Sequence, residues 1–149
     1  MVARLAIAVA IALVVGVIAW RLRRRPPEPP PRDVYPVPRQ LDRDDFPRPE
    51  APWLVVLFSS AVCLSCKGLP PKLAVLECAD VATCDIDAEN HGALHRRYEL
   101  SAIPMTLVAD ADGVVQKAFV GAFTATDLWA AVAELRSPGS TPEPDLGAV

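Results

Sequence analysis

The chain lacks the features by which several large classes of protein are recognised. It has 149 residues, a formal net charge of −3 at pH 7 and only 7 glycines. The acidic balance gives no basic footprint for nucleic acid. No Gly-rich phosphate loop or dinucleotide fingerprint is present, and no internal repeat is visible. We therefore expect neither nucleic acid nor nucleotide as a partner, and the length fits one domain.

Cysteine is also scarce, and two of the 4 cysteines form one motif, Cys63-Leu64-Ser65-Cys66. The apolar run Trp53–Phe58 before the motif predicts a buried strand, and Lys67–Leu73 after it can begin a helix. Cysteines three apart at such a junction lie on one side of the first helical turn, close enough to bond each other. Because CxxC is also half of many zinc sites, the rest of the chain has to decide between the two.

The segments after the motif alternate between predicted helices and strands. After the first helix come a strand over Val81–Asp87, a helix over about Asn90–Glu99, a strand within Ser101–Ala109, a turn at Asp110–Gly113, a strand ending at Val120 and a helix over Thr126–Arg136. The order is β-α-β-α-β-β-α, which predicts an α/β fold.

With CxxC ending its first strand and Ile103-Pro104 opening its third, the chain resembles the thioredoxin family from about Val37 to Arg136. The resemblance implies a thioredoxin-like α/β fold, a central mixed sheet flanked by helices. It implies that Cys63 is the attacking cysteine and Cys66 its resolving partner. Ile103 and Pro104 would then bind substrate, across a cis bond that faces the dithiol.

Further positions match the family one by one. They are Lys67 as the basic residue after the motif, Pro71 where the active-site helix kinks, Asp87 at the end of the central strand, and the late turn Val120-Gly121-Ala122. Other positions depart from it. Leu57 stands where thioredoxin has a buried acid, Val62 where it has tryptophan, Leu64-Ser65 where it has Gly-Pro, and Thr83 where a buried lysine is often found.

The chemistry of the motif also follows from its position. The attacking species in disulfide exchange is the thiolate, and a free thiol has a pKa of about 8.5. Backbone N–H groups and the dipole at a helix N-terminus favour that charged form, so Cys63 is the expected nucleophile. Ser65 is either a hydrogen-bond donor to this sulfur or, as favoured here, a solvated turn hydroxyl. No cofactor is expected beyond the redox-active Cys63–Cys66 disulfide, and electrons would come from another protein's thiols.

Cys78 and Cys84 have several interpretations. The favoured one places both near the core as small apolar residues. A second disulfide between them would need an oxidising compartment. A zinc site with His91 and His95 is disfavoured by the cysteine spacing, and the two histidines are expected on a solvated helix face.

The N-terminus predicts a membrane anchor, residues 1–22. Leu5 to Trp20 is an unbroken apolar run, apart from Gly16, and approaches the roughly 20 residues of a spanning helix. A cleaved signal peptide is disfavoured because arginines crowd the place of a cleavage site. Those arginines, Arg21–Arg25 above all, place the following domain on the cytoplasmic face by the positive-inside rule. The resemblance to membrane-tethered members of the family instead favours a domain on the outer side of the cytoplasmic membrane.

The remaining segments are assigned by composition. Residues 23–36 form a Pro/Arg-rich linker that begins with the stiff stretch Pro26–Pro31. The thioredoxin-like domain covers 37–136, opening with an edge strand at Val37–Leu41 and a helical turn at Asp42–Phe46. Residues 137–149 predict a disordered tail.

The sequence thus predicts a single-pass, membrane-anchored thiol–disulfide oxidoreductase that exchanges disulfides with partner proteins. Ile103 before the proline favours action as a reductase, by resemblance to reducing thioredoxins. Two alternatives stay open: a binding or delivery module of a membrane complex, and a redox sensor that uses Cys78 or Cys84.

Overall fold

Four strands form one sheet within residues 35–140, the part of the chain that the computed structural model describes. The strands are β1 (Trp53–Ser59), β2 (Val81–Asp87), β3 (Met105–Ala109) and β4 (Val115–Val120), in the order β2-β1-β3-β4. β1 is parallel to β2 and antiparallel to β3, and β3 is antiparallel to β4. The predicted mixed sheet is confirmed.

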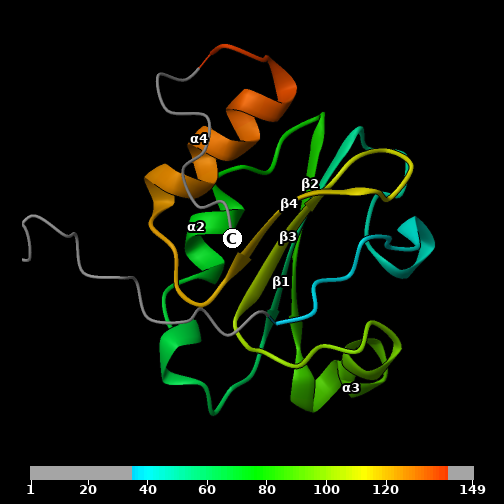
Figure 1. Cartoon of the computed structure of the whole chain (residues 1–149), viewed down its shortest axis with the longest axis vertical. Coiled ribbons are helices and arrows are strands. Elements are labelled where there is room, and N and C mark those ends of the chain that lie inside the picture. The colour runs from blue at the N-terminus through cyan, green and yellow to red at the C-terminus, as the bar shows by residue number, and fades with distance from the viewer. Residues whose placement is uncertain (1–34, 141–149) are drawn as a thin grey trace, which may run out of the picture. The chain divides into compact units, whose positions relative to one another are not determined.

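Helices cover both faces of this sheet (Figure 1). They are the short 3-10 helices η1 (Arg43–Asp45) and η2 (Leu64–Cys66) and the α-helices α2 (Pro70–Ala74), α3 (Ala88–Arg97) and α4 (Ala125–Arg136). α2 and α4 lie on one face and α3 on the other. Each face has its own apolar core, so the sheet is the middle of three layers.

The strand β1 is the centre of both cores. Leu54, Val56 and Phe58 pack toward α3, and Val55 and Leu57 toward α2 and α4. None of these five side chains has measurable exposure. A strand that is covered on both faces needs a continuous apolar run rather than an alternating pattern, and this is the pattern of its sequence.

The helix expected after the motif is broken in two, which corrects the prediction of one helix from Lys67. η2 ends at Cys66, the chain turns through Gly68 with φ of 78°, and α2 begins only at Pro70. Proline lacks an N–H and fits the first turn of a helix, where the N–H has no partner. Two successive prolines therefore start α2, and Pro71 lies in its first turn rather than at a kink.

The predicted edge strand at Val37–Leu41 is reduced to a single antiparallel bridge between Gln40 and Val114. It is flanked by hydrogen bonds from Leu41 N to Gly113 O (2.8 Å) and from Val115 N to Arg39 O (3.0 Å). The helical turn expected after it is η1. Proline at 36 and 38 removes donors that a longer ladder would use.

Arg43 connects this N-terminal segment to the rest of the domain through hydrogen bonds. Its guanidinium donates to the carbonyls of Asp110 (2.7 Å), Arg48 (3.2 Å) and Ala51 (3.0 Å). The side chain is buried, and burial lowers the pKa of its guanidinium. The three carbonyls replace the water that the charge has lost.

Among residues 35–140, no helix is long and apolar enough to cross a membrane. The predicted anchor (1–22), nearly all of the linker (23–36) and residues 141–149 of the predicted tail lie outside the described residues.

Gly113 is the residue where the N-terminal segment and the β3–β4 turn come closest. Its φ is 80°, and a Cβ there would stand 2.1 Å from the carbonyl oxygen of Leu41. We predict that Gly113→Ala lowers the free energy of unfolding by about 2–4 kcal/mol, measured by urea denaturation, because backbone has to move as well as adopt a strained angle.

Gly121→Ala is the matched control. Gly121 has a similar φ of 93°, but no atom of residues 35–140 lies within 4 Å of the added Cβ. It should cost only the conformational part, about 1–2 kcal/mol. Equal losses of unfolding free energy in the two variants would show that the close approach of Gly113 to Leu41 does not limit the side chain at this position.

Candidate active site

Cys63 and Cys66 form a disulfide in the segment that follows β1. The S–S distance is 2.19 Å and the Cα atoms are 5.4 Å apart. Cys63 is the N-cap of η2, and Cys66 is its last residue. The expected pairing at a strand-to-helix junction is therefore present, on one turn of 3-10 helix.

The two sulfurs have different surroundings. Cys63 is half-buried, and its Sγ accepts the backbone N–H of Cys66 at 3.2 Å. The Ser65 hydroxyl lies 3.4 Å from the same sulfur, so the structure favours the hydrogen-bonding role of Ser65 over the solvated turn. Cys66 is buried, at 5% exposure. The environment thus stabilises negative charge on Cys63 and shields Cys66 from solvent.

The Ile103–Pro104 bond is cis, as the resemblance implies. Pro104 is buried and its carbonyl accepts the N–H of Gly121 at 2.8 Å, while Ile103 is exposed. Met105, the next residue, pairs with Phe58, so the Ile-Pro step lies beside the end of β1 from which the disulfide segment leaves. The sheet register brings the two predicted substrate-binding residues to the same edge as the motif.

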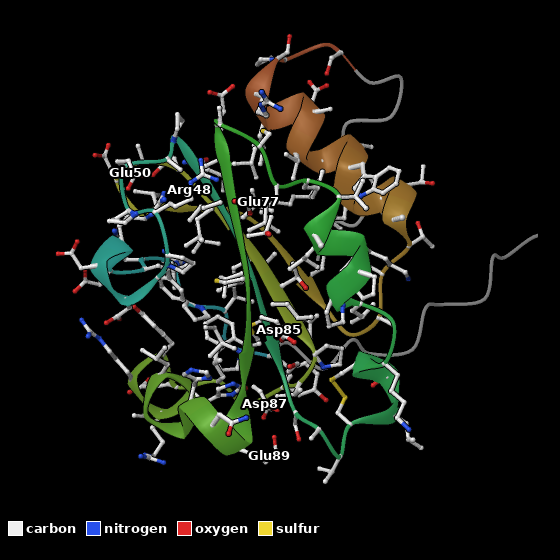
Figure 2. All side chains as sticks on the ribbon, turned by 180° about the vertical axis from the view of Figure 1, so that it is seen from behind. Arg48, Glu50, Glu77, Asp85, Asp87 and Glu89 are labelled. Atoms are coloured by element: carbon white, nitrogen blue, oxygen red, sulfur yellow. A yellow bond between two sulfur atoms is a disulfide. The ribbon has the colours of Figure 1, made fainter. Side chains whose placement is uncertain are left out.

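A cavity of about 270 Å³ lies beside the disulfide. Both cysteines line it, together with Lys67 and two carboxylates of β2, Asp85 and Asp87. Figure 2 shows Asp85, Asp87 and Glu89 following one another from β2 into the start of α3. Asp87 matches a family position in the sequence, but Asp85 was not expected at this site. The alternation along Val81–Asp87 was the available signal, because it puts both aspartates on one face of the strand.

Glu89 holds the segment between β1 and the motif. Its carboxylate accepts the Ser60 hydroxyl at 2.8 Å and the Ala61 N–H at 3.0 Å. A side-chain hydrogen bond with Asp87, followed by those bonds to Ala61 and Ser60, lowers the pKa of Glu89 to about 2. The same hydrogen bond raises the pKa of Asp87. Asp87 also caps α3, accepting the N–H of Glu89 at 2.7 Å.

The other two cysteines are free and differ from the expectation of two core residues. Cys78 is exposed, next to the start of β2, and only Cys84 packs against the core. Burial raises the pKa of the Cys84 thiol to about 12, so it stays protonated. Their free state means that the alternative second disulfide is not formed.

The histidines correct a smaller prediction. His91 is exposed at a kink in α3, but His95 is buried. A ring nitrogen of His95 lies 2.8 Å from the Ile86 carbonyl, and its ring stands edge-on to Phe58. Within residues 35–140, no group of three or more His, Cys, Asp or Glu side chains is arranged to hold a metal ion.

A mixed sheet with a disulfide after its first strand and a cis proline before its third defines the class of dithiol–disulfide proteins. A sequence model of the thioredoxin family matches residues 45–134, more than half of the chain. The chain therefore belongs to the thioredoxin family. It carries a thioredoxin domain with an active-site CxxC disulfide, the arrangement typical of a thiol–disulfide oxidoreductase.

Three solved structures of thioredoxins are similar to this chain. A mutant thioredoxin from Halobacterium salinarum is 24% identical, with a TM-score of 0.50 over 57% of this chain and 75% of that one. Mitochondrial thioredoxin 3 from Saccharomyces cerevisiae is 25% identical, with a TM-score of 0.48 over 57% and 80%. Fasciola hepatica thioredoxin is 24% identical, with a TM-score of 0.49 over 56% and 81%. A search of curated proteins found no match.

The carboxylate of Glu89 makes the free energy of unfolding depend on pH in the acid range. A carboxylate whose pKa is lower in the folded state stabilises the fold above its ordinary pKa, here 4.5, and loses that effect as pH falls toward 2. The raised pKa of Asp87 acts in the opposite direction. We predict that Glu89→Gln flattens the loss of stability between these pH values, measured as urea midpoints.

Glu50→Gln provides the comparison, since Glu50 is a surface carboxylate at the opposite end of β2 from Glu89 (Figure 2). It should leave the acid dependence as it is. An unchanged dependence in Glu89→Gln as well would show that Glu89 does not hold the segment before the motif.

Proposed function

We propose that this protein is a membrane-anchored thiol–disulfide oxidoreductase that reduces disulfides of partner proteins through Cys63 and Cys66. The unequal surroundings of the two sulfurs carry the proposal. One sulfur accepts an N–H and lies near a hydroxyl at the surface, and the other is buried one turn away. These surroundings suit Cys63 as the nucleophile and Cys66 as the resolving thiol.

In the reduced protein, the Cys63 thiolate attacks one sulfur of the partner's disulfide. The partner's S–S bond breaks, its second sulfur leaves as a thiolate, and Cys63 is joined to the partner in a mixed disulfide. Cys66 then attacks Cys63, which releases the remaining partner sulfur and forms the Cys63–Cys66 bond. The partner gains two electrons and this protein loses two, so another dithiol has to reduce it again.

The surroundings of Cys63 offer apolar contacts to a partner. Val62 and Leu64, its two neighbours, are 85% and 78% exposed. Ile103 is exposed at the same edge of the sheet and precedes the proline, where its main-chain groups suit an extended peptide. Ile103 at this position also supports action as a reductase, by resemblance to reducing thioredoxins.

The anchor is supported by the apolar run from Leu5 to Trp20. The arginines at 21 and 23–25 support a cytoplasmic domain. An anchored oxidoreductase would meet partners at the membrane surface, and the proline-rich stretch after the arginines would hold the domain away from the bilayer.

Cysteine variants test the exchange. Cys66→Ser should trap mixed disulfides with partner proteins, because the adduct on Cys63 can no longer be resolved. Cys63→Ser should trap on the order of tenfold less, since Cys66 is buried. The measurement is non-reducing electrophoresis of conjugates after rapid acid quenching.

Both variants are made in a Cys78→Ser background, which removes the exposed free thiol as a source of conjugates. Equal trapping by the two variants would contradict the assignment of Cys63 as the nucleophile. Conjugates that withstand reduction by dithiothreitol would not be disulfides at all.

Reporter fusions test the anchor and its orientation. Alkaline phosphatase fused after Val149 should be inactive and a cytoplasmic fluorescent reporter at the same place should be active, because the arginines stay inside. Both should follow the membrane fraction, and replacing residues 5–20 with polar residues should release them. Active phosphatase would overturn the orientation, and soluble full-length fusions would overturn the anchor.

A further inference from the structure

The resolving step needs a proton acceptor that β1 does not supply. Cys66 is buried, and in the mixed disulfide with a partner its thiol has to lose a proton before it can attack Cys63. Leu57, the β1 residue that faces α2, is apolar and has no measurable exposure. The proton must therefore go to a group outside β1.

Asp85 stands directly across from Leu57. The parallel register pairs Leu57 with Asp85, and paired residues of neighbouring strands project from the same face of a sheet. This is the face on which α2 lies. Asp85 and Cys66 also line one cavity of about 270 Å³ beside the disulfide.

The charged groups around the cavity distinguish Asp85 from its neighbours. Asp87 also lines the cavity, but it caps α3 and shares a hydrogen bond with Glu89, which is itself bound to Ser60 and Ala61. Asp85 accepts only the Ser59 hydroxyl, at 2.6 Å on Oδ1, and among residues 35–140 no bond is made to Oδ2.

The nearby cations do not neutralise Asp85. Lys67 lines the cavity, but residues 35–140 contain no ion pair between it and Asp85. Lys72 of α2 points away, donating to the Phe123 carbonyl at 2.8 Å. Asp85 is thus the carboxylate of the cavity with an oxygen available to a proton.

We propose that Asp85 takes up the proton that leaves Cys66 when the mixed disulfide is resolved. The proton passes from Cys66 Sγ to the Asp85 carboxylate, directly or through one water in the cavity. The Cys66 thiolate attacks Cys63 Sγ, the bond between Cys63 and the partner breaks, and its electron pair leaves on the partner's sulfur. That thiolate then takes the proton from Asp85. This role presupposes the disulfide exchange proposed above.

The test separates the two chemical steps. The reduced full chain with Cys78→Ser is mixed with one equivalent of dithiobis(nitrobenzoate), and release of the coloured thiolate is followed by stopped flow. The first phase is attack by Cys63 and the second is resolution by Cys66. Cys84 does not contribute, because its thiol stays protonated with a pKa of about 12.

Asp85→Asn should slow the second phase about tenfold or more near neutral pH and leave the first phase unchanged. The difference should shrink as pH rises, because hydroxide then removes the thiol proton without the help of a carboxylate. Asp85→Glu should restore the second phase to within about threefold, since it keeps the carboxylate. Asp112→Asn, the same charge change in the exposed β3–β4 turn, should alter neither phase.

A second phase that is unchanged in Asp85→Asn would overturn the role of Asp85. A faster second phase would overturn it too, because it would show that the carboxylate acts only by repelling the Cys66 thiolate. Failure of Asp85→Glu to restore the rate would have the same meaning. In each of these cases the proposed exchange stands, whereas absence of the first phase in the unaltered Cys63–Cys66 pair would refute that exchange itself.

Discussion

The burial of β1 is the constraint on which the site depends. Its side chains from Leu54 to Phe58 fill both cores, so the strand has no freedom to slide against β2 or β3. The register then determines which residues reach its carboxyl end: Asp87 opposite Ser59 on one side, and Met105, with the cis proline before it, opposite Phe58 on the other. The disulfide segment leaves from this rigid edge, and the groups around it come from three strands and the start of α3.

The sequence was sufficient for the order of elements and for the dithiol. The run Trp53–Phe58 predicted a buried strand, and the CxxC motif after it, together with the later elements, predicted a dithiol at the junction between strand and helix. It was not sufficient where two local preferences competed. The helical pattern after Cys66 predicted one helix. In the structure Gly68 turns the chain and the Pro70-Pro71 pair starts a new helix. Both effects depend on backbone angles, which the spacing of apolar residues does not reveal. His95 was likewise placed on a solvated face because its acceptor, the Ile86 carbonyl, belongs to another element.

The carboxylates beside the dithiol reach the site through the pairing of β2 with β1, which the pattern of a single segment does not show. Leu57 on β1 stands where the family has a buried acid, and along β1 alone this is only a departure from the family. The pairing of the strands also matters, because a residue on β2 can occupy nearly the same place in space as its partner on β1. Asp85 and Leu57 together, rather than either alone, define the surroundings of the resolving sulfur. Tertiary neighbours of this kind become visible only when strands are aligned side by side.

The position of Cys78 has a practical consequence. It precedes β2 and bridges to Val81, whereas the disulfide lies beyond the other end of the sheet, about 20 Å away for seven residues of strand. When Cys63 and Cys66 are bonded, Cys78 is the exposed thiol among the chain's 4 cysteines. Maleimide dyes or spin labels would therefore attach to the oxidised molecule at one position, remote from the redox pair, and could report on docking at the far edge.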